Sequence, residues 1–140
     1  MIKYSIYDFA NLFFDEASCI RWLVEKNVFY PFLICGACGG NMIININRQK
    51  YRCSSHTCRN ELSLMVYTFF YGSNLPCSKI RFLAYLWVSG ATWTVAKNMT
   101  GHSEHTITGF YNHFRKLISG CLDREDQVIG GLEIEMEIDE

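Results

Sequence analysis

The sequence has neither a secretory signal nor a hydrophobic run long enough to cross a membrane. The first eight of its 140 residues lack the apolar segment of a signal peptide. The longest apolar runs, such as residues 82–88, fall far short of the roughly 20 residues that a membrane-spanning helix needs. The cysteine count of seven is odd, which does not suit a framework of disulfides. These absences predict a protein of a reducing compartment, with free thiols and no membrane partner.

Acidic residues are scarce in the middle of the chain and abundant at its end. Residues 35–119 contain nine lysines or arginines and two acids, Glu61 and Glu104, which gives a net charge of +7. Residues 120–140 contain eight acids and one arginine, which gives −7. The overall charge of −1 hides this contrast. A basic body of this kind is typical of a protein that binds a polyanion.

The four cysteines between residues 35 and 58 form two close pairs. Two residues separate Cys35 from Cys38, four separate Cys53 from Cys58, and fourteen lie between the pairs. This spacing is typical of a zinc site in which each pair offers two thiolates from a tight turn. Because four thiolates fill a tetrahedral ion, the predicted zinc is structural. Three other interpretations stay open: His56 replaces one thiolate, the cysteines form disulfides, or they cluster without a metal.

The residues between and after the cysteine pairs predict a small sheet. Residues 42–46 and 51–53 are expected to form strands joined by a turn over 47–50, and a third strand is expected over 62–66. Such a zinc ribbon buries too little apolar surface to fold alone, so the metal is expected to contribute to folding. The single cysteines, Cys19, Cys77 and Cys121, are predicted to be small buried side chains.

The rest of the chain predicts helices. Residues 7–27 are expected to be helical, with Asp15 as a cap inside the segment. After a loop over residues 72–76, a helix capped by Ser78 is expected to run to Gly90.

Two further helices follow, and their junction is typical of a helix-turn-helix. Thr92 is expected to cap a short helix that ends near Asn98, and Ser103 to cap a longer one that ends at Gly120. A plain three-helix bundle is the alternative. The longer helix carries an apolar stripe, formed by Ile107, Phe110, Tyr111, Phe114, Leu117 and Ile118.

In a helix-turn-helix, the start of the second helix contacts base edges in the major groove. The expected base contacts are Glu104, His105, Thr106 and Thr108. The expected phosphate contacts, which give affinity without sequence choice, are Lys97, Asn112, Arg115 and Lys116. Glu104 has a second interpretation, as a favourable charge at the positive end of the helix dipole.

The sequence therefore predicts an α+β protein in four parts. These are an N-terminal helical segment (1–34), a zinc ribbon (35–72), a helix-turn-helix unit (73–121) and an acidic segment (122–140). In the last part, residues 132–139 alternate between apolar and acidic side chains, which predicts a strand with one buried face.

In this order the parts resemble the N-terminal portion of a Merlin-type DDE transposase and its bacterial insertion-sequence relatives. The resemblance covers residues 8–140 and ends on Ile138-Asp139-Glu140. It implies that Asp139 is the first of three acids that hold two magnesium ions in a ribonuclease-H-like domain. The other two acids of that family do not occur here, so we expect no DNA cleavage by this chain and no magnesium requirement. The further matching segments are 35–58, Ser73-x-Leu75-Pro76, Tyr85-Leu86-Trp87 and 95–107.

The resemblance implies a double-stranded DNA partner, namely the terminal inverted repeats of a transposon, and it is compatible with a homodimer. It also implies the nucleus as the location in a eukaryote, and the cytoplasm or nucleoid otherwise. Two alternatives stay open: a transposase-derived regulatory DNA-binding protein without enzymatic activity, and a scaffold whose ribbon binds another protein.

Overall fold

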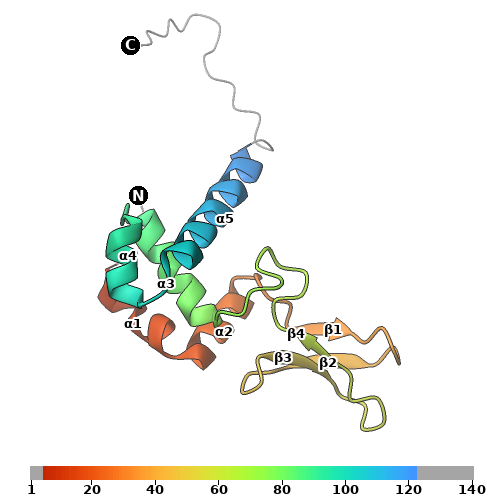
Figure 1. Ribbon diagram of the computed structural model, residues 1–140. Helices are drawn as coiled ribbons and strands as arrows, with labels where there is room; N and C mark the ends of the chain where they lie inside the picture. Colours follow the sequence, from red (N-terminus) through yellow and green to blue (C-terminus); the bar gives the residue numbers. More distant parts are fainter. Residues whose placement is uncertain (1–4, 123–140) are drawn as a thin grey trace, which may run out of the picture.

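The computed structural model describes residues 5–122, which fold into helices at one end of the molecule and a small sheet at the other (Figure 1). The chain is therefore of the α+β class, as predicted. The elements are α1 (Ile6–Phe14), α2 (Glu16–Glu25), β1 (Phe32–Ile34), β2 (Asn41–Asn45), β3 (Lys50–Cys53), β4 (Glu61–Ser63), α3 (Cys77–Val88), α4 (Trp93–Thr100) and α5 (Glu104–Leu122). The alternating segment 132–139 and Asp139 lie outside the described residues.

The predicted helical segment over residues 7–27 is in fact two helices. Asp15 adopts an extended conformation between α1 and α2, and its carboxylate accepts a hydrogen bond from the backbone N–H of Ser18 at 3.0 Å. The Ser18 hydroxyl also donates to this carboxylate, and these hydrogen bonds lower the pKa of Asp15. The predicted cap is thus confirmed, and it marks the break between the two helices.

The sheet contains four antiparallel strands in the order β1-β2-β3-β4. The sequence predicted three, and it missed β1, which begins directly after Pro31. The β4 strand ends at Ser63 rather than at residue 66. Met42 and Tyr51 point to the buried face. The other face carries a row of paired residues across all four strands, formed by Phe32, Ile43, Arg52 and Glu61.

The start of α3 corrects the prediction that Ser78 caps this helix. Ser78 lies inside the first turn and is buried, and no side chain of the residue before the helix forms a cap. Instead, the carboxylate of Glu16 on α2 accepts hydrogen bonds from the backbone N–H groups of Cys77 at 2.7 Å and Ser78 at 2.9 Å. A side chain distant in sequence therefore satisfies the free donors of α3 and fixes α2 against it.

The α4–α5 junction follows the prediction closely. The Thr92 hydroxyl accepts from the N–H of Val95 at 3.4 Å, and the Ser103 hydroxyl accepts from that of Thr106 at 3.2 Å. Gly101 ends α4 with a φ of 71°, a left-handed conformation that suits glycine. Ala96 is fully buried where the helices meet.

The far end of α5 differs from the prediction. The helix passes Gly120 and continues to Leu122. Leu117 and Ile118, the last residues of the predicted apolar stripe, are 40% and 45% exposed. The earlier residues of the stripe, Ile107, Tyr111 and Phe114, are buried. The second half of α5 thus extends beyond the helices that cover its first half (Figure 1).

The helices contact mainly one another, and the strands likewise, within the described residues. Cys19 on α2 and Cys77 on α3 are buried as predicted, and burial raises the pKa of Cys19 to about 11. Cys121 is exposed, so its predicted burial is wrong. Arg81 on α3 lies 3.3 Å from the ring centre of Trp22 and 5.1 Å from that of Phe9, which links the first three helices.

Candidate functional site

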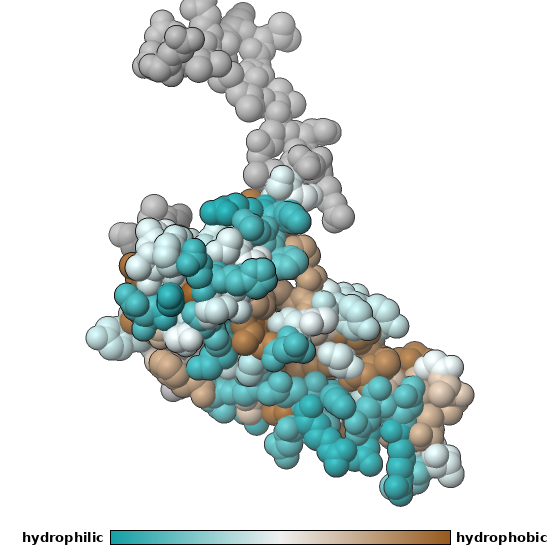
Figure 2. All heavy atoms as spheres, viewed as in Figure 1, coloured by the Kyte–Doolittle hydropathy of each residue, from teal (hydrophilic) through white to brown (hydrophobic). Residues whose placement is uncertain are grey.

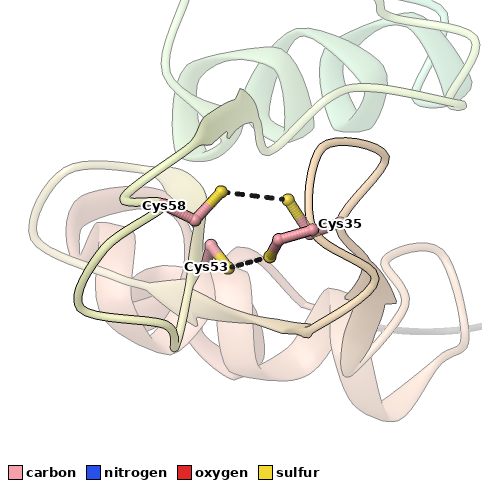
Figure 3. Close-up of side chains that lie close together, drawn as sticks. Cys35, Cys53 and Cys58 are labelled. Carbon is pink, nitrogen blue, oxygen red and sulfur yellow. Dashed lines mark hydrogen bonds between the residues drawn. The ribbon is translucent and has the colours of Figure 1, made fainter.

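Four cysteines converge at one end of the sheet, where two loops lie side by side. The Sγ atoms of Cys35 and Cys58 are 3.7 Å apart, and those of Cys38 and Cys53 are 3.4 Å apart. All four Sγ atoms lie within 4.8 Å of one another. Figure 3 shows Cys35, Cys53 and Cys58 pointing toward a common centre. The cysteines that pair in space therefore come from different loops.

This arrangement could hold a metal ion. Four thiolates at about 2.3 Å from a tetrahedral zinc ion would lie about 3.8 Å from one another. The separations of 3.4 and 3.7 Å are close to that value and too long for disulfide bonds. The described cysteines are all free thiols, which does not support the disulfide interpretation. His56 is exposed and does not belong to the cluster, so the interpretation with a histidine ligand gains no support either.

Backbone N–H groups prepare the cluster for negative charge. Hydrogen bonds from the N–H groups of Ala37 and Cys38 lower the pKa of Cys35 to about 6, and the Asn60 amide adds a contact at 3.7 Å. The N–H of Ser55 also lowers the pKa of Cys53, but burial and the neighbouring thiols outweigh it and raise that pKa to about 12. Without a metal ion, the negative charge of one thiolate makes it harder to ionise the thiols beside it. A divalent cation bound among the four sulfurs would remove this repulsion.

The two cysteine loops have related backbone structures. The N–H of Cys35 donates to the carbonyl of Gly40 at 2.8 Å, and the N–H of Cys53 donates to that of Asn60 at 2.9 Å. The residue after the second cysteine of each loop has a left-handed φ, of 70° at Gly39 and 50° at Arg59. The two loops therefore close in a similar way although the second is two residues longer, with arginine in the second loop where the first has glycine.

Gly40 leaves little room for a side chain because the sulfurs lie next to it. A Cβ atom on Gly40 would lie 3.3 Å from the Sγ of Cys38 and 3.7 Å from that of Cys53. A Cβ atom on Gly36, in the same loop, would meet nothing within 4 Å. The two glycines thus provide a natural contrast for testing the cluster.

The predicted nucleic-acid contacts on α5 share one exposed face of the helix. Glu104, Thr108, Asn112 and Arg115 follow one another at steps of four, four and three residues, which places them in one stripe. The neighbouring exposed residues on the same side are His105 and Lys116. Together these six residues span about 120° of the helix, beside the buried stripe. This surface is called the α5 polar face below.

Two of the predicted contacts differ from the rest. Thr106 is half-buried and lies outside the α5 polar face, and its hydroxyl is 2.9 Å from that of Ser103. Lys97 is exposed on α4. Within the α5 polar face, Arg115 donates to the side-chain oxygen of Asn112 at 2.9 Å. The structure therefore brings together most of the predicted residues, and the contact of the Thr106 hydroxyl with the capping residue Ser103 competes with a base contact.

A charged cluster on the outer face of the sheet was not predicted from the sequence. The carboxylate of Glu61 lies 3.1 Å from Arg48, 3.5 Å from Lys50 and 4.0 Å from Arg52. Partial burial opposes ionisation, but the hydrogen bond from Lys50 and the charges of Lys50 and Arg48 lower the pKa of Glu61. Part of this cluster follows from the strand, because Lys50 and Arg52 alternate on β3 and share a face, whereas Arg48 lies in the turn before it.

Comparison with protein-family models, curated proteins and solved structures found no significant match. None of the helices described over residues 5–122 combines the length and the apolar character needed to cross a membrane.

Proposed function

We propose that this chain is a zinc-dependent module that binds double-stranded DNA. The cysteine cluster holds one zinc ion, which organises a zinc ribbon, and α3, α4 and α5 form a helix-turn-helix unit. The observation that carries the proposal is the α5 polar face, an exposed polar surface on a helix that follows a tight turn. A helix placed in this way can enter the major groove with its first turns.

Zinc is the metal that the ligand set favours. Four thiolates select a soft or borderline ion, and zinc accepts them in a tetrahedron without redox chemistry. A site filled by four protein ligands leaves no position for a substrate. The zinc therefore has a structural role, and the amount of metal bound should be one equivalent per chain.

The α4–α5 pair supplies the DNA-binding element. Gly101 and the two residues after it turn the chain between the helices, and buried Ala96 lets them approach closely. Glu104 and Thr108 lie on the exposed side near the start of α5, where base edges are contacted. Arg115 and Lys116 lie further along the same side, and they suit phosphates.

The resemblance to Merlin-type transposases gives the proposal its DNA target, the terminal inverted repeats of a transposon. A regulatory protein with the same DNA-binding parts is the alternative. Selection of bound sequences from a random library separates them, because repeats at transposon ends support the first and scattered promoter sites support the second. Asp139 lies outside the described residues, so the proposal is confined to DNA binding.

The test compares two kinds of α5 variant in duplex binding at several salt concentrations. Arg115→Ala and Lys116→Ala should weaken binding to all sequences and lower the salt slope by roughly 0.9 for each lost phosphate contact. His105→Ala and Thr108→Ala should change sequence preference instead, by about 1–3 kcal/mol for a good base contact. Lys79→Ala, which removes an exposed charge from the start of α3, is the control. Equal behaviour of both kinds of variant would exclude α5 as the recognition helix.

A second candidate function, protein binding, is favoured by one observation. Phe32, Ile34 and Ile43 on the outer face of the sheet are 57%, 62% and 57% exposed. An apolar patch of this kind is typical of a contact with another protein. A protein that binds no DNA at low salt would support this function over the first.

A further inference from the structure

Two hollows beside the sheet are lined by residues that no predicted contact accounts for. One hollow of about 470 Å³ lies between α2 and the β2–β3 hairpin, and it includes Arg21 and Arg52. A second hollow, of about 220 Å³, lies beside the second cysteine loop and includes Arg59. The two hollows share Arg52, Cys53 and Ser54, so they adjoin one another. This surface is called the sheet groove below.

Three arginines, Arg21, Arg52 and Arg59, line the sheet groove beside the apolar side chains of Ile43, Ile44 and Ile46. No acidic side chain lines either hollow within the described residues. Glu61 lies at the rim, where it faces Arg48, Lys50 and Arg52. One carboxylate cannot neutralise three cations, and these side chains remain 61%, 50% and 39% exposed. In Figure 2 hydrophilic residues gather over the sheet.

The second cysteine loop accepts an unfavourable backbone conformation at an arginine of this groove. Arg59 has a φ of 50°, where the equivalent position of the first loop is Gly39. A left-handed conformation costs a residue with a Cβ atom about 1–2 kcal/mol. The Nε of Arg59 donates to the carbonyl of His56 at 3.0 Å, which holds the side chain against the loop. The turn thus accounts for the backbone of Arg59, and the same hydrogen bond leaves the rest of its exposed guanidinium free to face an anion.

We propose that the sheet groove binds the phosphate backbone of DNA and supplies most of the affinity. This proposal rests on the proposed function and divides it: the groove binds phosphates, while the α5 polar face selects the sequence. Charge supports the division. The groove and its rim carry five basic residues against Glu61, a net +4, whereas Lys97, Arg115 and Lys116 against Glu104 give +2. The five basic residues are Arg21, Arg48, Lys50, Arg52 and Arg59.

The spacing of the basic residues also suits a phosphate backbone. Lys50 and Arg52 alternate on β3 and share its outer face, since Asn45 and Ile43 are their respective partners on β2. Alternate residues of a strand lie about 6.6 Å apart. This distance is similar to that between successive phosphates on one DNA strand. Lys50 and Arg52 thus present positive charges at a spacing close to that of successive DNA phosphates.

Glu61 competes with DNA for these cations. A phosphate that binds Arg48, Lys50 or Arg52 meets a cation that already faces this carboxylate. Removing the charge of Glu61 should therefore strengthen DNA binding, an effect opposite to that of most substitutions in a binding site. Substitution of Glu61 should therefore raise the affinity for DNA, while substitution of the basic residues of the same cluster should lower it.

A structural role for the same arginines gives different results. Four thiolates and one zinc ion carry a net charge of −2, and Arg52 and Arg59 lie next to these ligands in the sequence. If the arginines only neutralise the metal site, their replacement should lower zinc affinity and leave the salt dependence of DNA binding unchanged.

The experiment measures binding of the zinc-loaded full chain to a 20-base-pair duplex of arbitrary sequence at several salt concentrations. Arg52→Gln and Arg59→Gln should each weaken binding several-fold and reduce the salt slope by about 0.9. Glu61→Gln should strengthen binding several-fold and steepen the slope by a similar amount. Lys79→Gln is the control for charge away from the groove. Zinc content, measured for each variant, shows whether the metal site is intact.

The outcomes separate this inference from the proposed function. Groove variants that keep their zinc and bind the duplex like the unaltered chain overturn the inference, while altered sequence preference in His105→Ala would leave the α5 assignment intact. A Glu61→Gln variant that binds no tighter contradicts the competition with DNA. An unaltered chain that binds heparin but not duplex DNA points to another polyanion and overturns both proposals.

Discussion

The sheet and the helical part of this molecule are stabilised in different ways. In the helical part, aromatic rings pack around Phe114 on α5, with Trp87 and Phe110 at 5.8 and 6.1 Å between ring centres. Phe70, from the segment between β4 and α3, also packs there at 6.1 Å. Buried Leu83 and Ile107 complete this core. Side chains of this size can stabilise a fold without other help.

The sheet has far fewer large apolar side chains that are buried. Two large side chains on its strands, Met42 and Tyr51, are almost fully buried, next to Cys35 and Cys53. The Tyr51 hydroxyl donates to the carbonyl of Tyr30 at 2.8 Å, which ties β3 to the segment before β1. Since the cysteines form part of the small core, we infer that the sheet depends on the metal and the helical part does not.

The largest effect on folding and metal binding is expected from the loss of a cysteine ligand. Cys53→Ser should abolish metal binding and unfold the sheet, because structural zinc supplies about 10–16 kcal/mol of binding free energy in small domains. Helical circular dichroism should be largely kept, and bound zinc should fall from one equivalent to none. Cys121→Ser is the control, because Cys121 is exposed and lies outside the cluster. Retention of zinc by Cys53→Ser would mean that another residue completes the site.

A smaller effect is expected from the cap on α3, and it should appear in the helical part. Glu16→Ala leaves two N–H donors of α3 without a partner, so it should lower the free energy of unfolding by about 1–3 kcal/mol. Glu25→Ala, at the exposed end of the same helix, is the matched control. Thermal or urea unfolding followed by circular dichroism measures the difference. Zinc content should be the same in both variants, and a loss of zinc only in Glu16→Ala would show that the two parts are coupled.

The smallest effect is expected from crowding of the metal site. Gly40→Ala places a methyl group 3.3 Å from the Sγ of Cys38 and should weaken zinc binding by about 1 kcal/mol, roughly fivefold. Gly36→Ala should leave it unchanged, because nothing lies within 4 Å of the new methyl group. A competition titration with a zinc-binding dye measures both affinities. Equal affinities would mean that the sulfurs move freely within the loop.

Features that depend on neighbouring residues could be predicted from the sequence. The caps at Asp15, Thr92 and Ser103 are of this kind, because each side chain reaches an N–H group three residues later. The cysteine cluster was also predictable, because the spacing within each pair determines which sulfurs can share an ion.

Features that depend on distant residues could not be predicted in this way. Ser78 had the sequence of a helix cap, but Glu16, 62 residues earlier, takes that role. The β1 strand has only three residues, and its outward side chains Phe32 and Ile34 are exposed, so its existence depends on pairing with β2. Leu117 and Ile118 continue the apolar period of α5, yet no helix covers them within the described residues.

Amide hydrogen exchange, with zinc and after its removal by a chelator, tests the central difference between the two parts most directly. With zinc, amides of the strands over residues 32–63 and of the helices over 77–122 should both be protected. After chelation, the strands should lose their protection while α3, α4 and the first half of α5 keep theirs. Strands that stay protected without metal, or helices that lose protection together with the sheet, would contradict the account.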